Sequence, residues 1–204
     1  MVPEKEQFSI SRFDQTQRVV FKNTTVSTLT ISNKDFVKSI SFDECSNITI
    51  ENNTLTNSEA FTQGIKVSNS HDISILNNQI KMSANSTTIE LDNSQNVLVL
   101  QNTLIDGGIS LSNSSNNIFS SNTIENCTIG INLNKGSNDN SFKDNSYNHV
   151  TKAYNISSDS SGNVFNDGLP APNSKNATGW SFQIVIVGLI PLFLIMNKKR
   201  SRIE

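Results

Sequence analysis

The chain has 204 residues, of which 35% are hydrophobic and 17% are charged, and its formal net charge at pH 7 is −2. A low charge of balanced sign argues against binding to nucleic acid, which requires a basic surface. Residues 8–169 carry one repeating pattern, so the sequence leaves no room for a second globular domain.

The N-terminal residues show short alternations of apolar and polar side chains. They read FSISRF (8–13), VVF (19–21), LTISNKDF (29–36) and SISF (39–42). A period of two is typical of a half-buried strand. We interpret these segments as the first coils of a repeat, with Lys34 in the position that an Asn takes in later coils.

From residue 46 the repeat becomes clear, because one phrase returns six times: SNITIENNTL (46–55), HDISILNNQI (71–80), QNVLVLQNTL (95–104), SNNIFSSNTI (115–124), NDNSFKDNSY (138–147) and SGNVFNDGL (161–169). One Asn recurs in it, as Asn53, Asn78, Asn102, Asn122 and Asn145, at steps of 25, 24, 20 and 23 residues. Gly168 takes the same place after a further 23 residues. A period in the low twenties indicates a solenoid.

A second apolar phrase follows each recurring Asn, as in GIKV (64–67), TIEL (88–91) and GISL (108–111). Each repeat therefore holds at least two short strands joined by tight turns. Equivalent strands of successive repeats stack into parallel sheets, and parallel connections are almost always right-handed. We predict an all-β domain over residues 8–169, a right-handed single-stranded parallel β-helix of about seven coils.

The recurring Asn residues have a structural explanation. Side-chain amides at one corner of each coil can bond to the amides above and below, and Asn tolerates the left-handed backbone of a sharp corner. We expect Asn53, Asn78, Asn102, Asn122 and Asn145 to form such a ladder. We expect Ile48, Ile50, Ile73, Ile75, Val97 and Val99 to point inward, and Phe119, Phe142 and Phe165 to stack.

Two adjacent coils contain extra residues, TNSEAFTQ (56–63) and KMSANST (81–87). We expect these insertions to bulge side by side as loops. Phe61, Gln63, Met82 and Asn85 are then candidates for a shallow patch that binds a sugar or a partner protein, because loops on rigid scaffolds often bind ligands. Loops that merely tolerate insertion are the alternative.

We predict no metal site and no cofactor. The two cysteines, Cys45 and Cys127, lie about three coils apart, which is too far for a disulfide. The two histidines, His71 and His149, also belong to distant coils.

The C-terminal residues predict a membrane anchor. Residues 169–179 (LPAPNSKNATG) read as a stalk, with the linker proper at 170–179. Residues 180–196 (WSFQIVIVGLIPLFLIM) carry no charge and are long enough to span a bilayer as one transmembrane α-helix. The basic tail, residues 197–204, is then cytoplasmic and the β-helix stands outside the cell. The alternative is a buried helix that caps the solenoid.

An exported domain needs an N-terminal signal, yet the chain begins MVPEKEQFSI without an apolar stretch. We therefore expect the native protein to begin upstream. Tail-anchored insertion with a cytoplasmic domain is the alternative, but it places the basic tail on the wrong side. Among eight Asn-x-Ser/Thr sequons, a number that composition alone explains, Asn176 and Asn155 are the candidates for glycosylation.

The pattern N-x-I-x-x-N-x-I followed by G-I-x-L resembles the parallel β-helix repeat family, over about residues 25–169. That family includes pectate-lyase-like sugar hydrolases and lyases, and periplasmic proteins similar to the copper-site maturation factor of nitrous oxide reductase. The resemblance implies the fold and a carbohydrate as the ligand class. One scaffold hosts many activities, so it implies no particular reaction.

The family's catalytic residues cannot be carried over to this chain. Enzymes of the family cluster carboxylates on one outer sheet, but equivalent positions of adjacent coils here never carry two acids, and Arg is absent between Arg18 and Arg200. Lys66 and Glu90 stack as a solvated ion pair. We therefore predict no catalytic residues and a non-catalytic module that binds carbohydrate or a surface protein. The alternatives are a lyase or hydrolase whose catalytic coils lie upstream, and an accessory factor of an extracytoplasmic assembly system.

Overall fold

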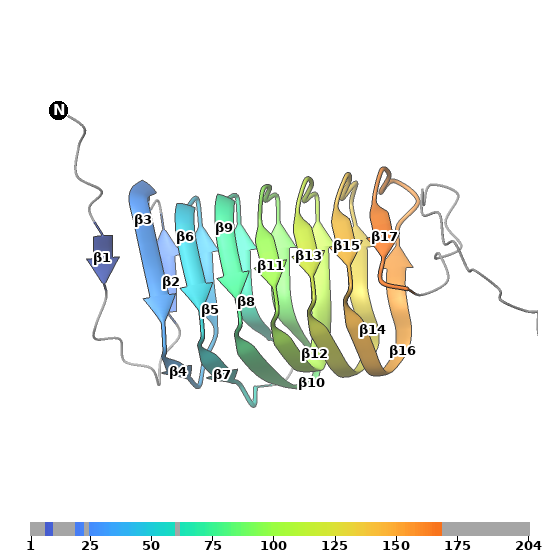
Figure 1. Ribbon diagram of the computed structural model, residues 1–204, viewed down its shortest axis with the longest axis horizontal. Coiled ribbons are helices and arrows are strands. Elements are labelled where there is room, and N and C mark those ends of the chain that lie inside the picture. Colours follow the sequence, from blue (N-terminus) through green and yellow to red (C-terminus); the bar gives the residue numbers. More distant parts are fainter. Residues whose placement is uncertain (1–6, 10–18, 23–24, 60–61, 169–204) are drawn as a thin grey trace, which may run out of the picture.

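The computed structural model describes residues 7–9, 19–22, 25–59 and 62–168, with the side chains of residues 7–9, 25–28 and 85 outside this description. The described residues form strands and turns that wind into one elongated column (Figure 1). The stalk, the apolar segment 180–196 and the basic tail lie outside the described residues. Within the described part of the chain, no helix is long and apolar enough to cross a membrane.

Two parallel sheets run the length of the column. Sheet A, in front in Figure 1, consists of β1 (Gln7–Ser9), β3 (Thr25–Ser32), β6 (Ser46–Glu51), β9 (His71–Leu76), β11 (Leu98–Leu100), β13 (Ile118–Ser120), β15 (Ser141–Lys143) and β17 (Val164–Asn166). Sheet B consists of β2 (Val19–Lys22), β5 (Ile40–Asp43), β8 (Gln63–Ser68), β10 (Gln79–Asp92), β12 (Thr103–Ser112), β14 (Thr123–Asn134) and β16 (Ser146–Ile156). The short strands β4 (Asp35–Phe36) and β7 (Thr54–Thr56) pair beside sheet B.

The prediction of a parallel β-solenoid is confirmed. The described residues contain about six complete turns, which begin at β3, β6, β9, β11, β13 and β15, with an incomplete turn at each end. The sequence predicted about seven, and the difference lies in these end turns. Every strand pairing is parallel, because each strand lies next to its equivalent in the following turn.

Side chains that point inward from both sheets form one continuous core. In sheet A the inward row is Ile50, Ile75, Val99, Phe119, Phe142 and Phe165, with register partners in neighbouring turns. The three aromatic rings stack with centroids 5.0 Å apart and interplanar angles of 13° and 7°. Because each turn buries its apolar face only against its neighbours, the core is a set of stacks rather than a single cluster around a centre.

The recurring Asn residues stand one above another at the corner after sheet A. Asn78 shows the pattern: its Nδ2 donates to Oδ1 of Asn102 (3.0 Å) and to the carbonyl of Ile50 (2.9 Å). Its Oδ1 accepts from the backbone N–H and the Nδ2 of Asn53. Each buried amide is thus held by bonds on both sides, which satisfies backbone groups that a sharp corner would leave without partners.

The left-handed backbone lies one residue before each ladder position, not at it. Asn33, Asn52, Asn77, Gln101, Ser121 and Asp144 have φ between 53° and 56°. The positive φ turns the chain, and the following Asn then points its amide into the corner. The ladder also ends differently than predicted. Gly168 has no side chain to offer, so the carboxylate of Asp167 accepts from the backbone N–H and the Nδ2 of Asn145.

Two further ladders were not predicted. Side-chain hydroxyls of Ser70, Ser94, Ser114, Ser137 and Ser160 accept backbone N–H bonds from the preceding turn at the corner after sheet B. A second amide ladder, Asn117, Asn140 and Asn163, occupies the start of sheet A in the last three turns. Both use small polar side chains to satisfy corner amides from the turn above.

Candidate functional site

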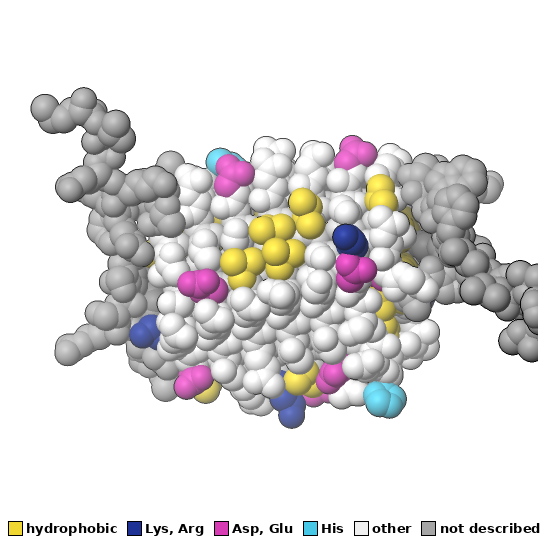
Figure 2. Space-filling model, viewed as in Figure 1, with side chains coloured by type: hydrophobic (Ala, Val, Ile, Leu, Met, Phe, Trp, Pro, Cys, Tyr) yellow, Lys and Arg dark blue, Asp and Glu magenta, His cyan; other side chains and the backbone are white. Residues whose placement is uncertain are grey.

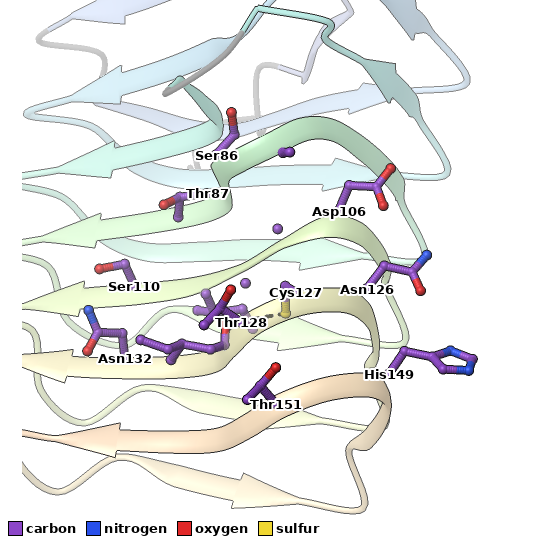
Figure 3. Close-up of a pocket in the computed structure, with 15 residues that line it drawn as sticks. Ser86, Thr87, Asp106, Ser110, Asn126, Cys127, Thr128, Asn132, His149 and Thr151 are labelled. Carbon is purple, nitrogen blue, oxygen red and sulfur yellow. Dashed lines mark hydrogen bonds between the residues drawn. The ribbon is translucent and has the colours of Figure 1, made fainter.

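The surface is hollowed most clearly where sheet B bends, over β10, β12, β14 and β16. The groove there has a volume of about 490 Å³ (Figure 3). It is centred on the shortest repeat of the chain, the 20 residues from Asn102 to Asn122. A short turn between longer ones forms a depression, because its backbone cannot reach as far outward as its neighbours do.

The strand register shows this directly. Between the pairs Ile105–Glu125 and Ile109–Ile131, β12 has the three residues 106–108 and β14 has the five residues 126–130. Between Lys81–Ile105 and Ser86–Gly107, β10 has the four residues 82–85 opposite the single residue 106. The strands on both sides therefore bulge around β12, and β12 becomes the floor of the groove.

Two glycines permit the floor to lie this deep. A Cβ at Gly108 would come within 2.1 Å of the carbonyl oxygen of Ile129, and a Cβ at Gly107 within 2.8 Å of that of Ser86. These are backbone atoms of the neighbouring turns and cannot move aside. Gly107 and Gly108 are therefore required by the close approach of three strands at the base of the groove.

One edge of the groove is a row of corner residues, Asp106, Asn126 and His149, in successive turns. All three have left-handed backbones, with φ of 62°, 56° and 54°. Figure 3 shows their side chains along the outer edge, pointing away from the strands. They occupy equivalent positions about 4.8 Å apart per turn, which separates Asp106 from His149 by about 10 Å.

Hydroxyl and amide groups form the opposite side: Ser86, Thr87, Ser110, Asn132 and, nearer the centre, Thr128 and Thr151. Asn132 is held in place, because its Oδ1 accepts from Nδ2 of Asn155 at 2.7 Å, and Asn155 accepts from Nζ of Lys152 at 2.8 Å. Thr88, beneath the surface, donates to the carbonyl of Gly108 at 2.8 Å. The wall is thus polar and its geometry is fixed by contacts between turns.

The electrostatic character of the groove is weakly acidic. Its lining includes one carboxylate, Asp106, and one imidazole, His149, and neither Lys nor Arg. Cys127 contributes a free thiol that donates to the carbonyl of Ile129 at 3.3 Å. Burial, and to a lesser extent the nearby Asp106, raise the pKa of the Cys127 thiol to about 11. The thiol is therefore protonated and unreactive at neutral pH.

The groove does not coincide with the patch that the sequence predicted. Met82 is only 3% exposed and belongs to the core, because β10 continues as a strand through it. Gln63 is half-buried in β8. Phe61 and the side chain of Asn85 lie outside the described residues. Met82 therefore cannot line a surface patch.

Other expectations hold in part. The two insertions do lie against each other, since Oγ of Ser83 donates to the carbonyl of Glu59 at 2.7 Å. Lys66 and Glu90 form an ion pair at 2.8 Å. Sequence reasoning missed the groove, although one signal was present: the step of 20 residues after Asn102 marks the turn that forms its floor.

The described residues bring together no group of three or more His, Cys, Asp or Glu side chains that could hold a metal ion. His71 contacts Asp72 at 2.8 Å, and the buried thiol of Cys45 donates to backbone carbonyls. Asn155 and the five ladder Asn residues make the contacts described above.

Residues 8–182 match the family model described as periplasmic copper-binding protein (NosD). The chain belongs to the NosD family. Its structural likenesses include the A-module of the mannuronan C-5 epimerase AlgE6 of Azotobacter vinelandii (TM-score 0.44, 16% identity, 79% of this chain and 50% of that one). They also include the D317A mutant of the periplasmic alginate epimerase AlgG (TM-score 0.43, 16% identity, 78% and 47%). No curated protein matches the chain.

The NosD chain spans about half the length of these solved structures. At 16% identity the likeness concerns the β-helical fold alone. The family model extends beyond the described solenoid to residue 182.

Proposed function

We propose that this NosD-family chain is a non-catalytic β-helix, displayed outside the cytoplasm, that binds neutral carbohydrate in the groove over β10, β12 and β14. The observation that carries the proposal is the lining of the groove, which combines hydroxyls and amides with a single carboxylate and no cation. Hydroxyl and amide groups both donate and accept hydrogen bonds, as sugar hydroxyls do.

The charge of the groove favours neutral sugars over uronic acids. A polyuronate would bring carboxylates next to Asp106 without a Lys or Arg in the lining to compensate them. A neutral glycan meets no such repulsion. Display outside the cytoplasm, where such glycans occur, agrees with the family's description as periplasmic.

The wall of the groove is rigid, which supports a binding role. The ladders that fix each turn also fix Ser110 and Asn132, the second through its bond to Asn155. Preorganised groups lose little conformational entropy when a ligand binds, so a modest number of hydrogen bonds is sufficient for affinity.

The lack of a carboxylate pair in the groove supports a non-catalytic role. Glycoside hydrolysis uses two carboxyl groups on either side of the scissile bond. In the row that holds Asp106, the next two turns present Asn126 and His149 instead. A lyase or hydrolase whose catalytic turns belong to another part of a longer protein is the alternative.

The family's description also suggests an accessory role connected with copper. The donors in the described part of the chain do not fit a copper site, because no three of them come together. We therefore derive no step through copper.

We further propose that residues 180–196 anchor the protein in a bilayer as a single-pass helix, with the basic tail on the cytoplasmic side. The uncharged composition of this segment and the following Lys and Arg residues support this. Extraction of native membranes with alkaline carbonate tests it, since a peripheral protein is released and a spanning one is retained. Release would contradict the anchor without affecting the groove.

The binding proposal is tested with cello- and manno-oligosaccharides, and with an oligogalacturonate as the acidic comparison, by titration calorimetry. Thr128→Trp places a large side chain in the groove and is expected to abolish binding of the neutral sugar. Thr56→Trp is the matched control, since Thr56 is an exposed strand threonine outside the groove. Failure of every neutral sugar to bind, equal loss in both variants, or cleavage of a sugar by the protein would contradict the proposal.

A further inference from the structure

The outer face of sheet A carries a compact group of aliphatic side chains. Leu76, Leu98, Leu100 and Ile118 point outward from β9, β11 and β13, and Ile118 is 48% exposed. Figure 2 shows hydrophobic side chains gathered in the middle of this face. They are contiguous, because Leu100 is the register partner of Leu76 and Leu98 that of Ile118.

Charges of opposite sign flank this aliphatic patch along one row of the sheet. The row runs Glu51, Leu76, Leu100, Ser120 and Lys143, one residue from each of five successive turns. Figure 2 shows acidic side chains on one side of the patch and a basic one on the other. Glu51 and Lys143 lie four strand spacings apart, about 19 Å, so they do not interact within one molecule.

This arrangement is complementary to itself. Consider a second copy facing sheet A, related by a two-fold axis that lies between the faces and runs along β11. The rotation keeps each row in place and reverses the order of the turns. Glu51 then lies opposite Lys143 of the second copy, and Leu100 lies opposite its own equivalent.

The same rotation brings the aliphatic side chains together. Leu98 and Leu100 of both copies meet at the centre, because β11 lies on the axis. On either side, Leu76 of one copy lies beside Ile118 of the other, since the two occupy neighbouring rows in turns that the rotation exchanges. The outward residues beyond them are polar: Thr49 and Ser141 face each other. A central apolar core with a charged rim is the anatomy of a specific interface.

We propose that the partner for the outer face of sheet A is a second copy of this chain, in an antiparallel, two-fold symmetric dimer. The apolar core supplies the attraction, and the two symmetric Glu51–Lys143 pairs set the register of the solenoids. The face is narrow, since three-residue strands are about 10 Å long, so the dimer is weak and depends on concentration. The groove lies on sheet B and stays open in this dimer.

Sedimentation velocity of the full chain over a concentration series, in a detergent that keeps residues 180–196 in solution, is the test. The wild type is expected to dimerise. Glu51→Lys and Lys143→Glu each convert both attractive pairs into repulsive ones, and each is expected to weaken the dimer about tenfold. The double variant E51K/K143E restores attraction, and its affinity is expected to return to within about twofold of the wild type.

A second pair of variants tests the apolar core. Ile118→Ser is expected to weaken the dimer roughly thirtyfold, because two side chains are lost from the interface. Val37→Ser is the matched control, since Val37 is 49% exposed but lies after β4, away from sheet A, and it is expected to have no effect. Circular dichroism verifies that all variants remain folded.

Three results would overturn the proposal. A chain that stays monomeric assigns the face to another protein or to a lipid surface. Charge reversals that are not rescued by the double variant exclude the antiparallel register. A dimer that none of these substitutions affects must form through another part of the chain.

Discussion

The first and the second half of the solenoid solve the same packing problem with different side chains. At the start of sheet A, the early turns place Ile48, Ile73 and Val97 in one buried row, and the later turns place Asn117, Asn140 and Asn163 in the same row. Two residues further, the aliphatic row of the early turns becomes the stacked rings of Phe119, Phe142 and Phe165.

The two halves differ in how strongly each residue depends on its neighbours. An aliphatic side chain packs against whatever apolar group lies above and below it. A buried amide requires a matching amide in the next turn and a carbonyl in the previous one, as Asn140 has in Asn163 (3.0 Å) and the carbonyl of Ser114 (3.0 Å). An amide row therefore has to continue through successive turns, whereas an aliphatic row can stop at any turn.

The largest expected effect is at the middle of the second amide ladder. Asn140→Leu removes the acceptor for the backbone N–H and the Nδ2 of Asn117, and the donor to Ser114. Leaving several buried groups without partners is expected to lower the free energy of unfolding by about 3–5 kcal/mol, measured by urea denaturation. Asn166→Leu, at an exposed position of sheet A, is the control. Equal effects would show that the ladder contributes nothing specific.

Introducing an amide into the aliphatic half should depend on its distance from the ladder. Val97→Asn places the new amide next to Asn117, whose Oδ1 already accepts from the backbone N–H of residue 97. The cost is expected to be below about 1 kcal/mol. Ile48→Asn has no amide neighbour and is expected to cost about 2–4 kcal/mol. Equal costs in thermal or urea denaturation would refute the requirement for a matching neighbour.

Alkaline pH is expected to weaken the C-terminal turns selectively. Burial raises the pKa of both tyrosines of the chain, Tyr147 and Tyr154, and their hydrogen bonds to the Asp167 carboxylate raise it further. In the unfolded chain they ionise near pH 10. The folded state then retains protons that the unfolded state loses, so stability is complete below about pH 10 and falls as the pH rises.

The slope above that pH is expected to approach about 2.7 kcal/mol per pH unit for two groups. Absorbance of tyrosinate during a pH titration reports these two residues alone, and hydrogen exchange should show opening first near β16 and β17. In the Tyr147→Phe/Tyr154→Phe double variant the slope should disappear. Ionisation of both tyrosines near pH 10 in the folded protein would contradict this account.

The smallest effect concerns Cys127, in the later half beside the groove. With its pKa raised to about 11 from 9.0, its reaction with iodoacetamide at pH 8 is expected to be on the order of a hundredfold slower than that of an exposed cysteine. Asp106→Asn removes the smaller cause and should accelerate it only modestly. Because Cys45 is buried, the rate reports on Cys127. A rate equal to that of a free thiol would show that the groove does not shield it.

The sequence predicted the repeat well because each turn repeats the same local chemistry. Alternating side chains such as Ile48 and Ile50 indicated strands, and the regular return of Asn53 and its equivalents indicated a corner with an amide ladder. It predicted the wrong direction for Met82, because an insertion between two strands can continue the strand as easily as it can form a loop. It missed the serine ladder, since Ser is also the commonest residue of ordinary turns.

The sequence by itself determined that the chain winds into a parallel solenoid, because a period of about twenty-three residues with two alternating phrases buries its apolar side chains in no other way. Only the tertiary structure decided where the surface is hollowed and which face is flat and apolar. The groove depends on how far β12 reaches relative to β10 and β14, and the aliphatic patch on which outward residues become neighbours across three turns. Both are relations between residues about twenty positions apart, which become visible only when the register of the turns is known.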